Sequence, residues 1–241
     1  MRASGMRFLL FGLCLLSAVA AGAQTDSAKH AAKKPKEPEQ YGHQLRFSFD
    51  ISKPILNVLQ DTRRSYEFAL DYYHRNEIYF VLEGGFGSAG YHYPELSYDT
   101  RNSFLRAGFD KTLIKRIGNK DWDMAFFGLR YGIAPIRRDV ATYTIIDSVW
   151  GSSSGTVPAA TALAHWAELT GGIKVELMKN LMVGWNLRGR FLLNETSFRE
   201  LRPVFIAGYG RGDRSTVFDF SVFVSYGIRW GGKEDVKEIV E

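Results

Sequence analysis

Histidine, serine and carboxylate side chains are the groups in this sequence that could support hydrolysis of an ester or a peptide. Such chemistry needs a serine activated by a histidine and a carboxylate, or a histidine beside an acid pair. The candidate residues are His43, His74, His92 and His165, with Ser48, Ser65 and Asp50. No spacing joins three of them, and a histidine in a turn or at a strand end needs no catalytic role. We therefore predict no catalytic residue and no enzymatic activity.

Metal binding and cofactor binding have even less support. The sequence contains no His-x-x-x-His pair and no cysteine cluster, and Cys14 is its only cysteine. Structural and catalytic metal sites in proteins are usually built from such groups. We predict neither a metal site nor a cofactor.

Ionisable side chains also recur at every second position of several apolar segments. If these segments are strands, the ionisable residues share one face, because side chains alternate along a strand. The acidic residues on that face are Asp50, Glu67, Asp71, Glu83, Asp110, Glu168 and Asp219, and the basic ones are Arg46, Arg106, Arg130, Lys174, Arg188, Arg190 and Arg229. Unpaired charges in a narrow, dry interior are costly. The equal numbers therefore predict ion pairs that fill the lumen of a barrel, whereas a selective pore would show a ring of one sign.

Eight segments alternate in hydropathy and could position these residues. In the clearest one, every second position from Phe218 to Trp230 is apolar, and the positions between them are mostly small or polar. The predicted strands cover residues 45–51, 66–72, 78–83, 105–110, 125–133, 163–175, 181–193 and 218–230. A strand of a membrane barrel is expected to alternate in this way over about 10 residues.

The links between the strands separate a membrane barrel from a soluble one. A lipocalin-like barrel or a sandwich also alternates, with its apolar face turned inward. Here long links alternate with shorter ones; the long ones are residues 52–64, 89–100, 134–162 and 194–216, and the shorter ones are residues 74–76, 112–120 and 178–180. Short periplasmic turns opposite long outer loops are typical of outer-membrane barrels. We predict an all-β, eight-stranded antiparallel transmembrane β-barrel of outer-membrane type, with a soluble β-protein as the alternative.

Aromatic residues near the strand ends are predicted to form girdles at the two membrane interfaces. The residues assigned to the girdles are Tyr72, Trp122, Trp185 and Trp230, with Tyr73 beside the first of them. The start of the fifth strand is ambiguous, because Trp122 also falls on the interior positions, with Met124 and Phe126.

The two ends of the chain differ from the barrel. Residues 1–23 combine a basic start, a short apolar core and the small residues Ala21-Gly22-Ala23, which is the layout of a cleavable signal peptide. Residues 24–41 are rich in Lys, Pro and Glu and are predicted to be a disordered periplasmic tail. The barrel is assigned to residues 42–230 and a charged C-terminal tail to residues 231–241.

Export and charge limit the partners. Removal of two arginines with the signal peptide changes 31 basic residues to 29, and against 26 acidic residues the net charge is then +3. This charge is too small to indicate nucleic-acid binding. The partners we predict are outer-membrane lipid, lipopolysaccharide and the barrel-insertion machinery, and the sequence names no extracellular partner.

Three segments resemble an uncharacterised family of Bacteroidota outer-membrane proteins that is catalogued as a domain of unknown function. They are FSFDISKPILNVL (47–59), FFGLRYGIA (126–134) and AHWAELTGGIKVELMKNLMVGWNLRGRFLL (164–193). The resemblance extends over about residues 41–230. It implies a barrel in the outer membrane and carries over no catalytic residue. The chain departs from a usual barrel ending, because it continues past Trp230 to Glu241.

The leading hypothesis is a non-enzymatic outer-membrane barrel with a side-chain-filled lumen, similar in architecture to small OmpA- or OmpX-type proteins, with a structural or surface-display role. One alternative is a narrow, porin-like transport barrel for a small or apolar solute. The other is a lipid-modifying enzyme of the outer membrane.

Overall fold

The structure is a computed structural model that describes residues 42–60, 62–74, 76–114, 121–147, 149, 151–194 and 201–231. The predicted signal peptide and N-terminal tail lie outside these residues, as does the predicted C-terminal tail beyond Gly231. In the described ranges, no helix is both long enough and apolar enough to cross a membrane.

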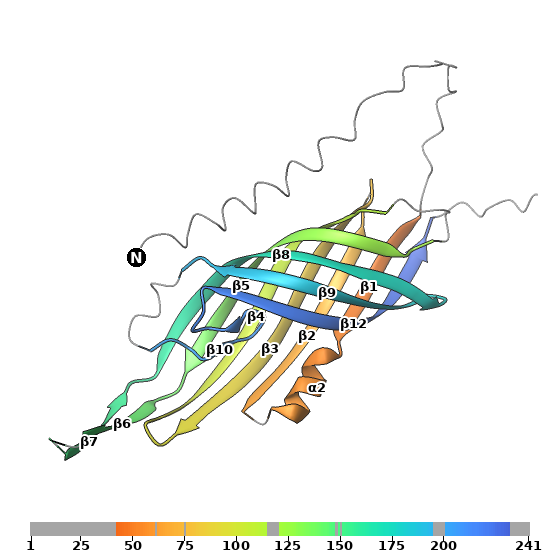
Figure 1. Cartoon of the computed structure of the whole chain (residues 1–241). Coiled ribbons are helices and arrows are strands. Elements are labelled where there is room, and N and C mark those ends of the chain that lie inside the picture. Colours follow the sequence, from red (N-terminus) through yellow and green to blue (C-terminus); the bar gives the residue numbers. More distant parts are fainter. Residues whose placement is uncertain are drawn as a thin grey trace, which may run out of the picture. The chain divides into compact units, whose positions relative to one another are not determined.

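Eight antiparallel strands of the described chain close into a barrel (Figure 1). They are β1 (His43–Asp50), β2 (Arg63–Tyr73), β3 (Ile78–Tyr93), β4 (Leu96–Thr112), β5 (Met124–Arg138), β8 (Ala160–Met178), β9 (Leu181–Leu192) and β12 (Thr216–Trp230). Each strand pairs with two neighbours, and β1 pairs with β12, so the ring is complete. The predicted all-β, eight-stranded antiparallel barrel is confirmed.

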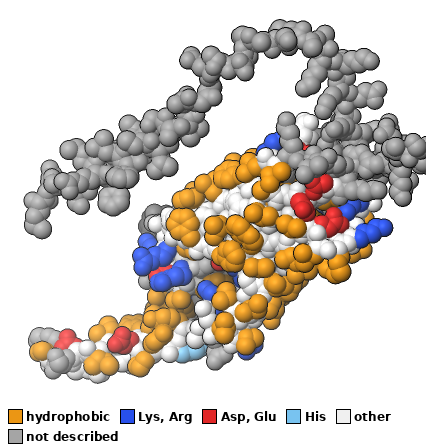
Figure 2. All heavy atoms as spheres, turned by 45° about the vertical axis from the view of Figure 1, so that its right-hand side comes forward, with side chains coloured by type: hydrophobic (Ala, Val, Ile, Leu, Met, Phe, Trp, Pro, Cys, Tyr) orange, Lys and Arg blue, Asp and Glu red, His pale blue; other side chains and the backbone are white. Residues whose placement is uncertain are grey.

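The two faces of the strands differ in burial and in chemistry. Along β5, buried and more exposed side chains alternate without interruption from Met124 to Arg138. The exposed positions carry large apolar residues such as Phe127, Leu129 and Tyr131, while Arg130 between them is buried. Figure 2 shows hydrophobic side chains spread over the outside of the barrel, with many of the visible charges toward its two ends. Apolar side chains therefore face outward and charged ones inward.

The two ends of the barrel carry different connections. At one end, which we call the turn end, β2 is followed by β3, β4 by β5, and β8 by β9. The other, which we call the loop end, carries α2 (Ser52–Leu59), the turn at residues 94–95, a hairpin of β6 (Ala141–Asp147) and β7 (Gly151–Val157), and residues 201–215, which we call loop 4. Loop 4 contains the short strands β10 (Phe205–Ile206) and β11 (Gly210–Arg211).

Two of the predicted long links are mostly β-structure. Residues 89–100 continue β3 and β4, which remain paired as far as Tyr93 and Leu96. Residues 134–162 contain the end of β5, the start of β8 and the β6–β7 hairpin, in which β6 also pairs with β4. The prediction missed these extensions because alternation marks a strand only where one face is apolar. In these extensions apolar residues such as Tyr93, Ile145 and Ile146 do not follow a simple alternation.

Candidate functional site

Ion pairs fill the middle of the lumen around Glu168 of β8. Its carboxylate lies 3.2 Å from a guanidinium nitrogen of Arg106, 3.0 Å from one of Arg188 and 2.9 Å from one of Arg190. All four side chains are buried. Charged hydrogen bonds of this length are among the stronger polar interactions in proteins, and together they offset the cost of removing the charges from water.

Glu83 of β3 takes part in the same cluster. Its carboxylate oxygens lie 2.6 Å from Arg106, 2.8 Å from Arg130 and 2.6 Å from Arg188. Arg130 also donates to both carboxylate oxygens of Asp110, at 2.8 and 3.0 Å. Because these residues come from β3, β4, β5 and β9, the ion pairs cross-link barrel strands that are far apart in sequence.

Helix α2 contributes a buried lysine that the sequence analysis missed. Lys53 Nζ lies 2.7 Å from Asp219, 3.7 Å from Glu67 and 3.9 Å from Asp50. Its position in a predicted loop gave no sign of this role. Arg229, which the alternation placed inside, is partly buried at the turn end, with its guanidinium 5.1 Å from the centre of the Trp122 ring and 2.8 Å from Glu176.

The ionisable residues predicted for the lumen all have an oppositely charged neighbour. We call this set the lumen network: Arg46, Asp50, Glu67, Asp71, Glu83, Arg106, Asp110, Arg130, Glu168, Lys174, Arg188, Arg190 and Asp219. Asp219 is partly exposed and the others are buried. Arg138 is a further buried base nearer the loop end, where the carbonyl oxygens of Pro158 and Leu201 accept hydrogen bonds from it.

An apolar layer closes the lumen on the turn side of the network. Asp71 pairs with Lys174 and Arg46, and the Arg46 guanidinium lies 4.5 Å from the centre of the Tyr79 ring. The layer consists of Tyr73, Tyr79, Val81, Trp122, Met124, Phe126 and Met182. Sequence reasoning did not anticipate this layer, apart from the noted ambiguity of the fifth strand.

Loop 4 folds into the opposite end of the lumen. Its buried residues Phe205, Ile206, Ala207 and Tyr209 pack in one cluster with residues that include Phe104 and Trp166. The carbonyl oxygen of Gly208 accepts a 2.6 Å hydrogen bond from Arg106, and that of Tyr209 accepts a 2.8 Å bond from Arg190. Loop 4 is therefore tied directly to the lumen network and covers its loop side.

The rim of loop 4 carries its own ion pair. The Arg211 guanidinium donates to both carboxylate oxygens of Asp213, at 3.0 and 2.6 Å. These hydrogen bonds lower the pKa of the Asp213 carboxyl below its ordinary value. Both side chains are largely in solvent, so the pair adds little stability.

The predicted aromatic girdles need one correction. Tyr72, Trp185 and Trp230 lie on the outer face, with His43 stacked against both Tyr72 and Trp230. Trp122, in contrast, is only 4% exposed and belongs to the apolar layer inside the turn end, as does Tyr73. Trp122 has the same parity as Met124 on β5, and burying its ring inside the lumen removes more apolar surface from water than an interfacial position.

The candidate catalytic residues are not brought together. Ser48 Oγ lies 2.8 Å from Ser225 Oγ, and the Ser65 backbone N–H donates to the Asn57 side chain. His43 lies beside Tyr72, and His165 lies beside Tyr131. None of these contacts joins a serine, a histidine and a carboxylate. Among the described residues, no group of three or more His, Cys, Asp or Glu side chains could hold a metal ion.

A Ser–His–Asp arrangement does occur at residues that the sequence analysis did not combine. His92 Nδ1 lies 2.8 Å from Ser97 Oγ, and His92 Nε2 lies 3.3 Å from Asp99 Oδ1. His92 and Ser97 are direct partners across the β3–β4 hairpin. The arrangement is open to solvent, with the His92 side chain 60% exposed and the Asp99 side chain 54% exposed. Only the unpredicted extension of this hairpin places the three side chains together.

Solved structures with a similar barrel share little sequence with this chain. The N-terminal β-barrel domain of Pseudomonas aeruginosa OprF is 12% identical, with 78% of this chain and 98% of that chain covered and a TM-score of 0.33. Ail, the attachment invasion locus protein of Yersinia pestis, is 9% identical over 78% of this chain and 100% of that one, with a TM-score of 0.40. Neisserial surface protein A is 8% identical over 78% and 96%, with a TM-score of 0.37.

A comparison with curated proteins finds no match. A family model, in contrast, matches residues 6–230, which is nearly the whole chain. The matched range includes every strand of the barrel and the residues of the lumen network. The chain therefore belongs to the family described as domain of unknown function DUF6048.

Proposed function

We propose that the protein is a non-enzymatic barrel of the bacterial outer membrane with a structural or surface-display role. The observation that carries the proposal is the inverted distribution of its side chains. Large apolar residues such as Phe47, Leu105 and Leu187 are exposed on the outside, while the lumen network is buried inside. A soluble barrel keeps its apolar face inward, and a barrel in lipid turns that face outward.

The height of the apolar outer face supports the same assignment. On β4, the outward side chains between Arg101 and Lys111 are uncharged, and these two residues are ten positions apart. At about 3.4 Å per residue and a strand tilt of about 40°, ten residues span about 26 Å. The apolar band of outer-membrane barrels is about 25 Å tall.

The orientation follows from the predicted signal peptide and the two barrel ends. We place the turn end in the periplasm, where β1 begins and β12 ends, and the loop end outside the cell. Outward Tyr72 and Trp230 then lie at the periplasmic interface, with Trp185 further into the band. In this placement, the partners we propose are outer-membrane lipid, lipopolysaccharide and the barrel-insertion machinery. The Bacteroidota source stays a prediction.

The filled lumen favours a structural role over transport. The lumen network lies between the apolar layer at the turn end and the buried part of loop 4, and the network is bonded to loop 4 through Gly208 and Tyr209. A solute would have to break buried ion pairs to pass. The loop end, with the β3–β4 and β6–β7 hairpins, is the part that such a barrel would display.

Fractionation and heat-dependent gel mobility test the membrane assignment. We expect the protein in the outer-membrane fraction, and we expect unboiled samples to migrate differently from boiled ones because a closed barrel stays folded in cold detergent. In planar bilayers, purified protein should give no steady single-channel steps. Recovery in the soluble periplasmic fraction would contradict the membrane assignment, whereas steady conductance would contradict only the filled lumen and would favour the transport alternative.

The contacts among His92, Ser97 and Asp99 raise a hydrolase as the alternative to the non-enzymatic barrel. A histidine between a serine and a carboxylate is the arrangement that activates a serine nucleophile. Catalysis also needs donors for the developing oxyanion and exclusion of water, and the three side chains here lie open on a hairpin. We therefore expect no labelling of Ser97 by a fluorophosphonate probe. If the probe labels the parent protein but not the Ser97→Ala variant, Ser97 is a reactive serine, and the hydrolase would be favoured instead.

A further inference from the structure

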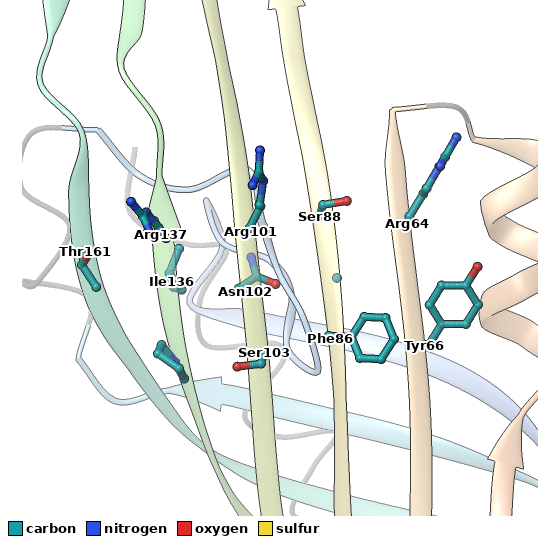
Figure 3. A pocket seen from close by; sticks show the side chains of 12 residues that line it. Arg64, Tyr66, Phe86, Ser88, Arg101, Asn102, Ser103, Ile136, Arg137 and Thr161 are labelled. Carbon is teal, nitrogen blue, oxygen red and sulfur yellow. The ribbon is translucent and has the colours of Figure 1, made fainter.

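Three outward arginines lie at one level of the barrel wall. The strand registers pair Arg64 with Ser88, Ser88 with Arg101, Arg101 with Arg137, and Arg137 with Thr161. These five residues belong to the neighbouring strands β2, β3, β4, β5 and β8, and all five are exposed. They form one continuous row around the wall, which we call the arginine row (Figure 3).

The arginine row carries positive charge that the described part of the chain does not balance. Arg101 and Arg137 are direct cross-strand partners on the same face, where like charges destabilise a sheet. Asp139 lies 3.9 Å from Arg101, and both side chains are largely in solvent. Among the described residues, neither Arg64 nor Arg137 has an ion-pair partner. An anion bound from outside would relieve this repulsion.

A hollow of about 760 Å³ adjoins the row on the outer wall. Its lining includes the arginine row together with Tyr66, Phe86, Ser103 and Pro135. Figure 3 shows Ser103, Phe86 and Tyr66 at a second level beside the row. The hollow is therefore basic on one side and largely apolar on the other.

Pro135 gives a physical reason for the hollow. It has no N–H, so it cannot donate to the neighbouring strand. β4 and β5 pair at Asn102–Ile136 and again at Leu105–Ile133, with no pairs between these two positions. The strand pairing in the barrel wall is therefore interrupted at this point, directly next to the arginines.

We propose that the arginine row and this hollow bind lipopolysaccharide, with a phosphate of its lipid A on the arginines and an acyl chain against Tyr66 and Phe86. The inference rests on the proposed membrane assignment, which puts the row at the outer edge of the apolar band. A phosphate monoester carries about 1.5 to 2 negative charges at neutral pH, and arginine binds phosphate in a bidentate fashion. The positive charge of the row thus complements the negatively charged phosphate. The hollow, with arginines on one side and Tyr66 and Phe86 on the other, suits the boundary between the headgroup and the acyl chain.

The orientation of the hollow favours a lipid over a protein partner. From the row, its lining runs toward Tyr66 and Phe86, and the next outward residues toward the turn end are apolar ones such as Phe68 and Leu105. This is the direction of the membrane interior and not of the surface loops. A protein docked from outside would meet the hairpins first.

The test compares two triple variants that remove the same charge. R64Q/R101Q/R137Q neutralises the arginine row, and K111Q/K179Q/R214Q neutralises three other exposed basic residues. Purified proteins in a neutral detergent are titrated with bisphosphorylated lipid A and with lipid A lacking its phosphates, and binding is followed by native mass spectrometry. We expect the row variant to bind bisphosphorylated lipid A at least about tenfold more weakly than the parent protein, because charged hydrogen bonds are lost. The control variant should stay within about twofold, and removal of the phosphates should abolish the difference between the parent and the row variant.

Equal binding by the parent and the row variant would overturn the inference. An equal loss in both variants would also overturn it, because the attraction would then be general. Heat-dependent gel mobility of each preparation reports whether the variant is folded, and the single variants R101Q and R137Q serve if the triple variant is not. An absence of the parent protein from the outer membrane would overturn the proposed function, and that result is independent of the titration.

Discussion

Replacement of Glu168 by Gln is expected to lower the free energy of unfolding by about 3–5 kcal/mol. The substitution keeps the size of the side chain and removes one negative charge from a site with three guanidinium groups, those of Arg106, Arg188 and Arg190. The remaining carboxylates already pair with the same arginines, so the interior is left with one uncompensated positive charge. Breaking a buried ion pair on one side is costly for this reason.

Urea unfolding of the protein in lipid vesicles, followed by tryptophan fluorescence, measures this effect. The matched control is Glu95→Gln, which removes the same charge from an exposed turn between β3 and β4. We expect the control to change the stability by no more than about 0.5 kcal/mol. An unchanged midpoint for Glu168→Gln would mean that water screens these charges, and the filled lumen would then be wrong.

Gly172→Ala is expected to lower the free energy of unfolding by at least about 2 kcal/mol. Gly172 of β8 pairs with Phe126 on one side and Asn186 on the other, both of which are buried in the interior. A Cβ atom at this position would lie 2.1 Å from the carbonyl oxygen of Trp185 and 2.8 Å from Cα of Asn186. Both atoms belong to the backbone of β9, so the neighbouring strand would have to move.

The adjacent residue provides the control. Gly171→Ala places its Cβ on the outer face, where the nearest atom is the Phe126 carbonyl oxygen at an ordinary 3.5 Å. We expect this variant to be as stable as the parent or more stable by up to about 1 kcal/mol, because alanine loses less backbone entropy on folding than glycine. Equal unfolding midpoints for the two variants would contradict the close strand approach inside the barrel.

The sequence by itself determined the eight strands and which face of each strand is charged. Both follow from local alternation, because a strand with lipid on one side and the barrel interior on the other carries apolar and polar side chains at alternating positions. The position of Glu168 or Arg130 inside the barrel could therefore be predicted without knowing its partners. The assignment of Trp122 to an aromatic girdle was wrong because it relied on an aromatic residue near a strand end, whereas alternation itself puts Trp122 on the interior face.

Only the tertiary structure decided how the lumen is closed and what lies at its rim. Lys53 enters the lumen network from a helix, and the buried part of loop 4 enters from a long connection, and neither element alternates. The His92–Ser97 contact and the arginine row depend on which residues of neighbouring strands stand opposite each other. That register is set by how the closed ring of strands is staggered, which is a property of the whole barrel and not of any one segment.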